Sequence, residues 1–139
     1  SWKYNKGPIV ENSIYYGEVY DARLEQPGWN KTGFDDKNWS NSKIYDSPNG
    51  KLKAQMSASD RITGTIKPVS IKTLKKGVYV YDFGTVFSGW VKLKVNGKKG
   101  SKLKMIFLED NGNNYEQSDT YILKGEGNEV WEPKFTWHA

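Results

Sequence analysis

The sequence predicts an all-β protein, an antiparallel β-sandwich of jelly-roll type. Val91, Leu93 and Val95 alternate with Lys92 and Lys94, which is the period of a strand with one buried face and one wet face. Glycine, proline, asparagine and aspartate punctuate the chain at intervals that suit short strands. No run of ten residues has the hydrophobic period of a helix, so the sequence favours an all-β fold over a mixed one.

Residues 77–108 are expected to form the centre of the fold. Residues 77–84 are apolar on both faces and rich in β-branched and aromatic side chains, which is typical of a central strand covered on two sides. Residues 96–100 then supply turn-forming residues, and residues 102–108 run back as another strand. We therefore expect a β-meander on which the other segments pack.

The remaining strands are expected on both sides of this centre. They are predicted near residues 2–4, 14–24, 65–66, 69–71, 120–124 and 131–137. In the last of them Trp131, Phe135 and Trp137 should face inward, and the pattern then stops abruptly, as expected of a piece of a longer protein. Residues 46–50 give the clearest boundary signal, so we expect a loop-rich segment at 1–48 and a β-sandwich module at 49–139.

Composition limits the chemistry of the chain. Without cysteine and with His138 as the single histidine, it has no disulfide, no thiolate metal site and no site that needs two imidazoles. No segment approaches the length of a membrane span, so no membrane partner is expected. The net charge is +5, and six lysines of one hairpin could form a basic patch for nucleic acid: Lys92, Lys94, Lys98, Lys99, Lys102 and Lys104. These lysines are better explained as the outward positions of amphipathic strands, where they keep one face soluble. No nucleic-acid partner is therefore expected.

Aromatic side chains suggest a carbohydrate-binding surface. If residues 14–24 are extended, Tyr16, Glu18 and Tyr20 point the same way and form an aromatic face with one carboxylate. Asp21 is a further candidate in the same stretch. Trp29 and Trp90 are further candidate stacking faces. The alternative is that the tyrosines pack in the core and Arg23 pairs with a nearby carboxylate.

Calcium is the one metal for which the sequence offers candidate ligands. Asp35, Asp36 and Asn38 cluster oxygen atoms that a hard cation prefers, but their spacing matches no known calcium loop. Asx turns, in which these side chains bind the local backbone, are the alternative. Residues 109–114 also have the oxygen content of a cation site without the EF-hand register, and a plain turn is favoured there.

Taken together, several stretches resemble one family, the bacterial α-L-rhamnosidases of glycoside hydrolase family 78. Each stretch is a weak motif, but their order and spacing over nearly the whole chain are specific. They are residues 7–9 (Gly-Pro-Ile), 14–23 (Ile-Tyr-Tyr-Gly-Glu-Val-Tyr-Asp-Ala-Arg), 28–29 (Gly-Trp), 33–36 (Gly-Phe-Asp-Asp) with Trp39, 65–68 (Thr-Ile-Lys-Pro), 79–84 (Tyr-Val-Tyr-Asp-Phe-Gly), 89–91 (Gly-Trp-Val), 120–125 (Thr-Tyr-Ile-Leu-Lys-Gly) and 132–136 (Glu-Pro-Lys-Phe-Thr).

The resemblance implies β-sandwich modules that precede a helical (α/α)6 barrel. The family hydrolyses terminal α-L-rhamnosides with inversion, using two carboxylates on that barrel, and no segment of this chain matches the barrel. The resemblance therefore implies no catalytic residue in this chain, with the barrel of the parent protein as its missing partner. Rhamnose-containing glycans are the implied ligands.

Three hypotheses of function follow. The first is a non-catalytic β-sandwich fragment of an α-L-rhamnosidase-like glycoside hydrolase that supports the barrel and helps to hold a sugar chain. The second is a stand-alone, lectin-like sugar-binding module, with calcium as in some N-terminal modules of the family. The third is nucleic-acid binding through the lysine-rich hairpin. A strand edge left exposed could also pair two copies of the chain into a dimer.

Overall fold

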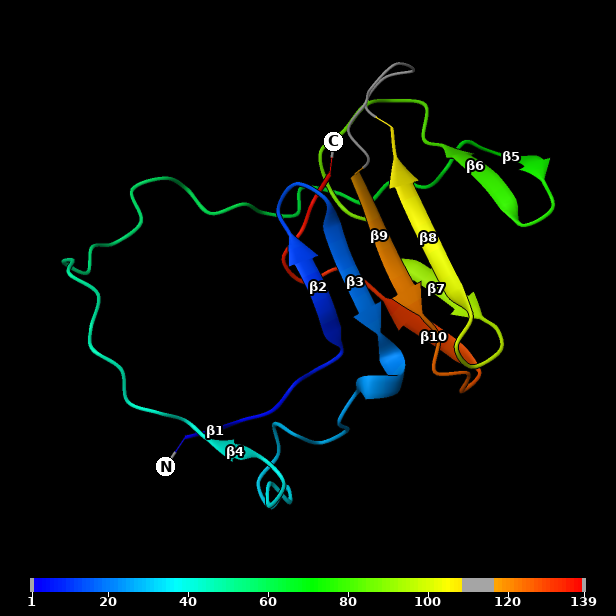
Figure 1. The fold of residues 1–139 in the computed structure, drawn as a ribbon. Helices are drawn as coiled ribbons and strands as arrows, with labels where there is room; N and C mark the ends of the chain where they lie inside the picture. Colours follow the sequence, from blue (N-terminus) through cyan, green and yellow to red (C-terminus); the bar gives the residue numbers. More distant parts are fainter. Residues whose placement is uncertain (1, 109–116, 139) are drawn as a thin grey trace. The chain divides into compact units, whose positions relative to one another are not determined.

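The computed structural model describes residues 2–108 and 117–138 (Figure 1). The chain divides into two units, of which unit 1 comprises Ser1–Ser42 with Phe87–Ala139 and unit 2 comprises Lys43–Val86. The described residues form β-strands and a short 3-10 helix, η1 (Ala22–Leu24). No helix in this part of the chain has the length and apolar character needed to cross a membrane.

A four-stranded sheet is the framework of unit 1. Its strands are β2 (Ile9–Ser13), β3 (Gly17–Asp21), β9 (Gln117–Ile122) and β8 (Lys102–Phe107), side by side in that order. The β2–β3 and β8–β9 pairs are antiparallel, whereas β3 and β9 run parallel. Because parallel neighbours cannot be joined by a tight turn, this pair brings together parts of the chain that are far apart in sequence.

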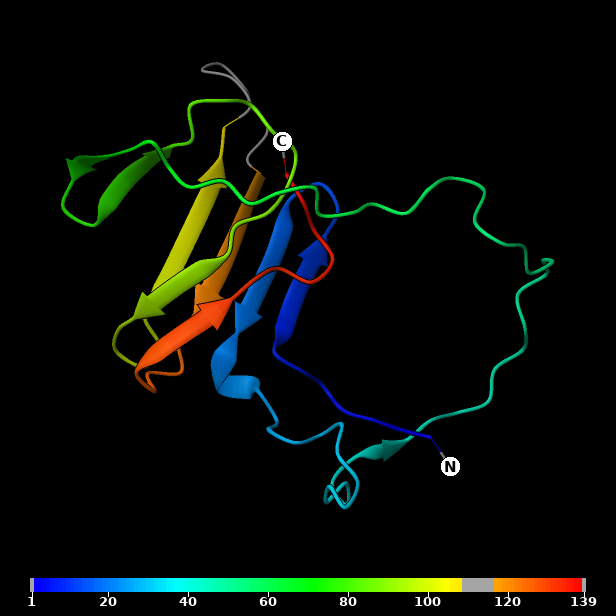
Figure 2. The same ribbon diagram turned by 180° about the vertical axis from the view of Figure 1, so that it is seen from behind.

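A second sheet completes the sandwich. It pairs β7 (Leu93–Asn96) with β10 (Asn128–Trp131) in antiparallel register. Figures 1 and 2 show this pair against one face of the four-stranded sheet. Unit 1 also contains the short antiparallel pair of β1 (Lys3–Tyr4) and β4 (Ser40–Asn41).

The core of unit 1 lies between these two sheets. Tyr121 and Leu123 come from β9 and the residues after it, and Trp131 comes from β10; all three are buried. The ring centroids of Tyr121 and Trp131 are 5.5 Å apart, and Tyr20 stacks on Tyr121 at 5.8 Å. Each large side chain removed from water in this way stabilises the fold by about 1.5–3 kcal/mol.

The predicted fold class is confirmed: unit 1 is an all-β sandwich. The outward lysines of β7 and β8 are exposed and alternate with half-buried apolar residues, as the sequence pattern indicates. The predicted meander is wrong, however. β7 and β8 follow one another in the chain but belong to different sheets, because the turn at residues 97–101 carries the chain from one layer to the other and binds Leu123 rather than closing a hairpin.

The prediction of a central strand at residues 77–84 is also wrong. β6 (Val78–Asp82) pairs with a single neighbour, β5 (Ser70–Lys75), and every residue of both strands is exposed. Apolar side chains on both faces of a strand become buried only where layers cover both faces, and within unit 2 no such layers are present among the described residues. The strand expected at residues 65–66 is absent as well.

The last segment faces the other way from the prediction. Trp131 is buried as expected, but Phe135 and Trp137 are exposed, while Thr136 and His138 are buried. The cause is Pro133, which cannot donate to a sheet and follows the end of β10 by two residues. The backbone after Pro133 is irregular, so the buried positions are 136 and 138 instead of the expected 135 and 137.

Two further expectations remain open. The oxygen-rich loop at residues 109–114 lies outside the described residues. The division of the chain at residue 48 stays a prediction.

Gly17 provides a test of the β3–β9 pairing. Its φ is +104°, and a Cβ there would meet the backbone oxygen of Ser118 and lie 2.8 Å from Asp119 Oδ1. We expect Gly17→Ala to lower the free energy of unfolding by at least about 2 kcal/mol, because backbone strain and a steric clash add. Urea unfolding followed by tryptophan fluorescence measures the change.

Gly7→Ala is the matched control, because the same added methyl group at Gly7 meets nothing within 4 Å. It should change the free energy of unfolding by less than about 0.5 kcal/mol. Equal effects of the two substitutions would contradict the close approach of β3 to β9.

Candidate functional site

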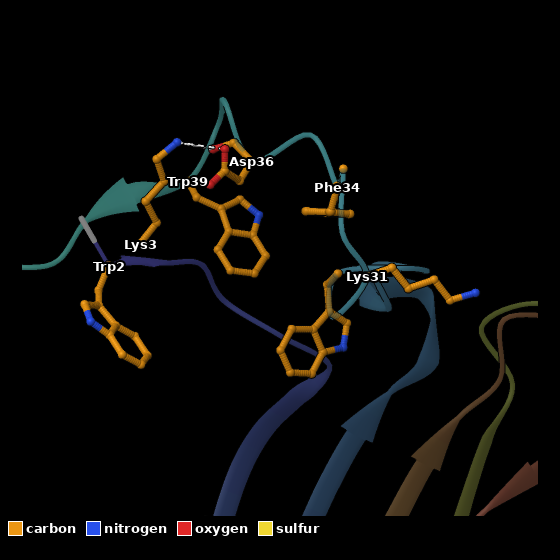
Figure 3. Close-up of a pocket in the computed structure, with 8 residues that line it drawn as sticks. Trp2, Lys3, Lys31, Phe34, Asp36 and Trp39 are labelled. Carbon is orange, nitrogen blue, oxygen red and sulfur yellow. Dashed lines mark hydrogen bonds and ion pairs between the residues drawn. The ribbon is translucent and has the colours of Figure 1, made fainter.

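An open hollow lined by aromatic side chains is the candidate site. Its volume is about 440 Å³, and it lies within unit 1. Four aromatic rings and three charged side chains surround it, together with Gly33; they are Trp2, Trp29, Phe34, Trp39, Lys3, Lys31 and Asp36. Figure 3 shows the indole of Trp39 between Trp2 and Phe34, whereas the Lys31 side chain extends away from the other labelled side chains. We call this feature the aromatic hollow.

Local backbone structure brings these residues together. The β1–β4 pair places Lys3 opposite Asn41. Trp2 precedes Lys3 in the sequence and Trp39 lies two residues before Asn41, so the pair brings the two tryptophans to the same part of unit 1. Between them the chain makes successive turns, in which the amides of Trp29, Lys31 and Phe34 donate to carbonyls three residues back. Gly28 and Gly33 have positive φ values in these turns, a conformation that glycine adopts without strain.

Some of the rings are fixed and others are open to solvent. Trp39 Nε1 donates to Gln26 Oε1 at 3.0 Å, and its ring contacts Phe34 edge to face at 5.6 Å. By contrast, Trp2 is 87% exposed and Trp29 is 61% exposed. Large exposed aromatic faces of this kind are costly to hydrate, so their grouping in a hollow makes it a candidate binding surface.

Two of the charged groups in the hollow form an ion pair. Lys3 Nζ lies 2.8 Å from Asp36 Oδ1, and both side chains are partly exposed. The pair offers both donors and acceptors beside the rings. An arrangement of open aromatic faces with a polar edge suits a ligand that has an apolar face and hydroxyl groups around it.

Of the three calcium candidates, Asp36 lines the hollow, whereas Asp35 and Asn38 do not. Asp36 faces Lys3, and Asp35 lies 3.4 Å from Lys37 Nζ and accepts from the Lys37 amide at 3.2 Å. A calcium ion bound by Asp35 and Asp36 would therefore have to replace the lysines that now pair with these two carboxylates. Among the described residues no group of three or more His, Cys, Asp or Glu side chains could hold a metal ion. Calcium binding at Asp35, Asp36 and Asn38 stays a prediction.

The other predicted sugar-binding residues do not meet at one surface. Tyr16 is exposed in the turn before β3, whereas Glu18 is fully buried. Tyr20 is half-buried against the core, and its hydroxyl donates to Glu25 at 3.0 Å. Asp21 is buried, caps η1 and binds Arg23 at 2.7 Å, which lowers the pKa of its carboxyl.

Trp90 lies in a different environment. Its Nε1 donates to Glu132 at 2.9 Å, and Lys92 Nζ lies 3.0 Å from the other oxygen of that carboxylate. Both contacts lower the pKa of Glu132, with the Trp90 hydrogen bond as the larger cause. Of the six predicted residues, only Trp29 lines the hollow. Trp2, Phe34 and Trp39 were not expected to be site residues; their aromatic character was the available signal, but their proximity depends on the β1–β4 pair.

The fold and the hollow define a class, a β-sandwich module with an open hollow lined by aromatic side chains. Family models make the assignment more specific. Residues 1–64 match the α-L-rhamnosidase N-terminal domain, and residues 72–139 match the bacterial α-L-rhamnosidase concanavalin-like domain. The chain belongs to the bacterial α-L-rhamnosidase family, as part of its N-terminal β-sandwich region.

Individual relatives agree with this assignment. The chain is 35% identical to an α-L-rhamnosidase of Formosa agariphila over its whole length but covers 16% of that protein. It resembles a solved α-L-rhamnosidase from Dictyoglumus thermophilum at 40% identity and a TM-score of 0.87, covering 96% of this chain and 16% of the other.

A solved α-L-rhamnosidase of Streptomyces avermitilis, complexed with L-rhamnose, is 35% identical with a TM-score of 0.85 over 95% of this chain and 14% of the other. The chain thus spans about a sixth of the length of the relatives that it matches.

The ion pair in the hollow should contribute little to stability. We expect Lys3→Met to change the free energy of unfolding by less than about 1 kcal/mol, because partly exposed ion pairs are screened by water. Thermal unfolding measures this, with Lys37→Met as the matched control at a more exposed pair. If Lys3→Met alone lowered the free energy of unfolding by several kcal/mol, the expectation would be contradicted, because the Lys3–Asp36 pair would then be needed for the stability of the fold.

Proposed function

We propose that this chain is a non-catalytic β-sandwich region of a larger α-L-rhamnosidase and that it binds carbohydrate in the aromatic hollow. The observation that carries the proposal is the exposure of Trp2 and Trp29 beside the Lys3–Asp36 pair. The solved relative that contains L-rhamnose supports the choice of sugar. Rhamnose-containing glycans are therefore the proposed ligands.

The physical basis is the complementarity of a sugar ring to an indole. One face of a pyranose carries C–H groups with slight positive charge, which pack on the negative face of an aromatic ring. Its hydroxyl groups remain at the edge, where Lys3 can donate to them and Asp36 can accept from them. The open form of the hollow suits a residue within or at the end of a glycan chain.

The proposal includes a supporting role for the rest of the sandwich. The matched relatives are about six times as long as this chain, so most of the parent protein is available to pack on it. Unit 2 offers exposed apolar side chains for such packing, among them Ile71, Tyr79 and Tyr81 on the β5–β6 hairpin. Burial of these side chains against the parent would stabilise both partners.

Binding should be measurable on this chain by calorimetry. We expect saturable binding of L-rhamnose or of a rhamnose-terminated oligosaccharide, and at least a tenfold weaker affinity for Trp29→Ala, which is about 1.4 kcal/mol. Trp137→Ala is the matched control, because Trp137 is similarly exposed but does not line the hollow. Titrations with and without calcium test whether Asp35, Asp36 and Asn38 contribute.

The binding proposal fails if no titration is saturable, or if Trp29→Ala binds as well as the unchanged chain. If Trp137→Ala weakened binding and Trp29→Ala did not, the sugar site would lie outside the hollow.

The chain alone should not hydrolyse rhamnosides. An inverting glycosidase needs two carboxylates on opposite sides of a cleft with room for a water, whereas Glu18 and Asp21 are buried and hydrogen-bonded within the fold. Release of nitrophenol from an aryl α-L-rhamnoside should therefore equal the rate without protein. Turnover that copurifies with the chain and persists on repurification would contradict the non-catalytic assignment.

A further inference from the structure

The aromatic hollow presents two open indole faces rather than one. Trp2 and Trp29 are both largely exposed, whereas Trp39 is half-buried, and all three line the hollow. In the part of the chain that the structure describes, no ring contact joins Trp2 to Trp29. An exposed ring that is not stacked on another side chain keeps a face free for a ligand, so the hollow has two such faces.

The two open rings come from different segments of unit 1. Trp2 directly precedes β1. Trp29 belongs to the run of turns that leads to Phe34, in which its amide donates to the Gln26 carbonyl at 3.2 Å. Figure 3 shows the Trp39 indole between Trp2 and Phe34. Trp39 therefore forms the floor, with Trp2 on one side of it and the turns that carry Trp29 on the other.

Hydrogen bonds fasten these segments to one another. The Gln26 side chain bridges two of them, because Nε2 donates to the Lys6 carbonyl at 3.0 Å and Oε1 accepts from Trp39 Nε1 at 3.0 Å. The Ser42 amide donates to the Trp2 carbonyl at 2.8 Å and holds the start of the chain. The backbone spacing of the two open rings is therefore set before a ligand arrives, which lowers the entropic cost of binding.

Each open ring has a lysine from its own segment at the hollow. Lys3, next to Trp2, donates through Nζ to the Asp36 carboxylate at 2.8 Å and to the Asp36 carbonyl at 3.3 Å. Lys31 is two residues from Trp29 and forms no ion pair among the described residues. Its side chain extends away from the other labelled side chains (Figure 3), so its ammonium is available at the outer edge of the hollow.

We propose that the aromatic hollow contains two sugar subsites, at Trp29 and at Trp2, and that it recognises two consecutive sugar residues of a glycan. This inference rests on the proposed binding of carbohydrate in the hollow and names its ligand class. The volume of about 440 Å³ lies in the range of about 300–1,000 Å³ of pockets that hold ligands larger than one hexose. The apolar faces of the two sugars pack on the two indoles, while their hydroxyl groups meet Lys31 at one subsite and the Lys3–Asp36 pair at the other.

The number of subsites determines how affinity depends on the length of the sugar. A single L-rhamnose occupies the Trp29 subsite, whereas the second residue of a disaccharide reaches Trp2 while it is already tethered. We therefore expect a rhamnose disaccharide to bind at least about tenfold more tightly than L-rhamnose. A third residue finds no further ring in the hollow and should add less than about twofold. Calorimetry on this chain measures these affinities with L-rhamnose, disaccharides that differ in linkage, and the corresponding trisaccharides.

Substitutions at Trp2 separate the two subsites. Trp2→Ala should weaken the tightest disaccharide at least about tenfold and leave the affinity for L-rhamnose unchanged within about twofold. Trp2→Tyr keeps an aromatic face and should retain most of the gain from the second sugar. The Trp2 ring is so exposed that its removal leaves no cavity, so both variants should fold. Trp137→Ala, at an exposed tryptophan outside the hollow, is the matched control and should change neither affinity.

The indole N–H signals in NMR spectra give an independent measurement. L-rhamnose should shift the signal of Trp29, and the disaccharide should shift those of both Trp29 and Trp2. Equal affinities for L-rhamnose and every disaccharide, with Trp29 still required, would overturn the two subsites but leave the proposed function intact. An equal loss for both sugars in Trp2→Ala would overturn them too, because both rings would then serve one sugar. Absence of saturable binding by any of the sugars would overturn both proposals.

Discussion

The parallel pairing of β3 with β9 is the interaction on which the rest of unit 1 depends. It places Val19 beside Thr120 and Tyr20 beside Tyr121, and the Glu18 amide donates to Asp119 across 101 residues of sequence. Among the described residues, β2 joins the sheet through β3 alone, and β8 joins it through β9 alone. Without this pair the four-stranded sheet would separate into two isolated hairpins, which are marginally stable in water.

The same pairing builds the interior of unit 1. It stacks Tyr20 on Tyr121 in the core, and it aligns Glu18 with Asp119 in a buried polar cluster. The aromatic hollow depends on a different and smaller element, the β1–β4 pair with the turns between Gln26 and Trp39. The proposed sugar-binding surface and the buried polar cluster therefore depend on different strand pairs.

Local pattern predicted local structure well. The alternation of Leu93 and Val95 with lysines identified the half-buried strand β7, and the turn residues after it marked its end. What could not be predicted was the partner of each strand. A period of two residues defines which side chains share a face, but it does not distinguish β8 from β10 as the neighbour of β7. The proline after β10 likewise reversed the facing of Phe135 and Trp137 without a signal in the alternation.

The candidate site was predictable only in part for the same reason. Trp29 could be named because a tryptophan in a turn-rich segment is a candidate stacking face, whereas Trp2 and Trp39 join it through the pairing of Lys3 with Asn41 and Tyr4 with Ser40. Glu18 and Asp21 belonged to an apparently exposed tyrosine-rich face. Their burial comes from β9 and from the segment after β10, which no local pattern reveals. The resemblance to the α-L-rhamnosidases supplied the family, and the family models confirm it.

The most direct test of this account is the measurement of NOEs between backbone protons of β3 and β9 in the chain in solution. The parallel register predicts cross-strand contacts between residues 19–21 and residues 120–122, together with slow exchange of the amides that pair them. Contacts confined to the β2–β3 and β8–β9 hairpins, with independent exchange of the two, would contradict the claim that this pair holds the sandwich together.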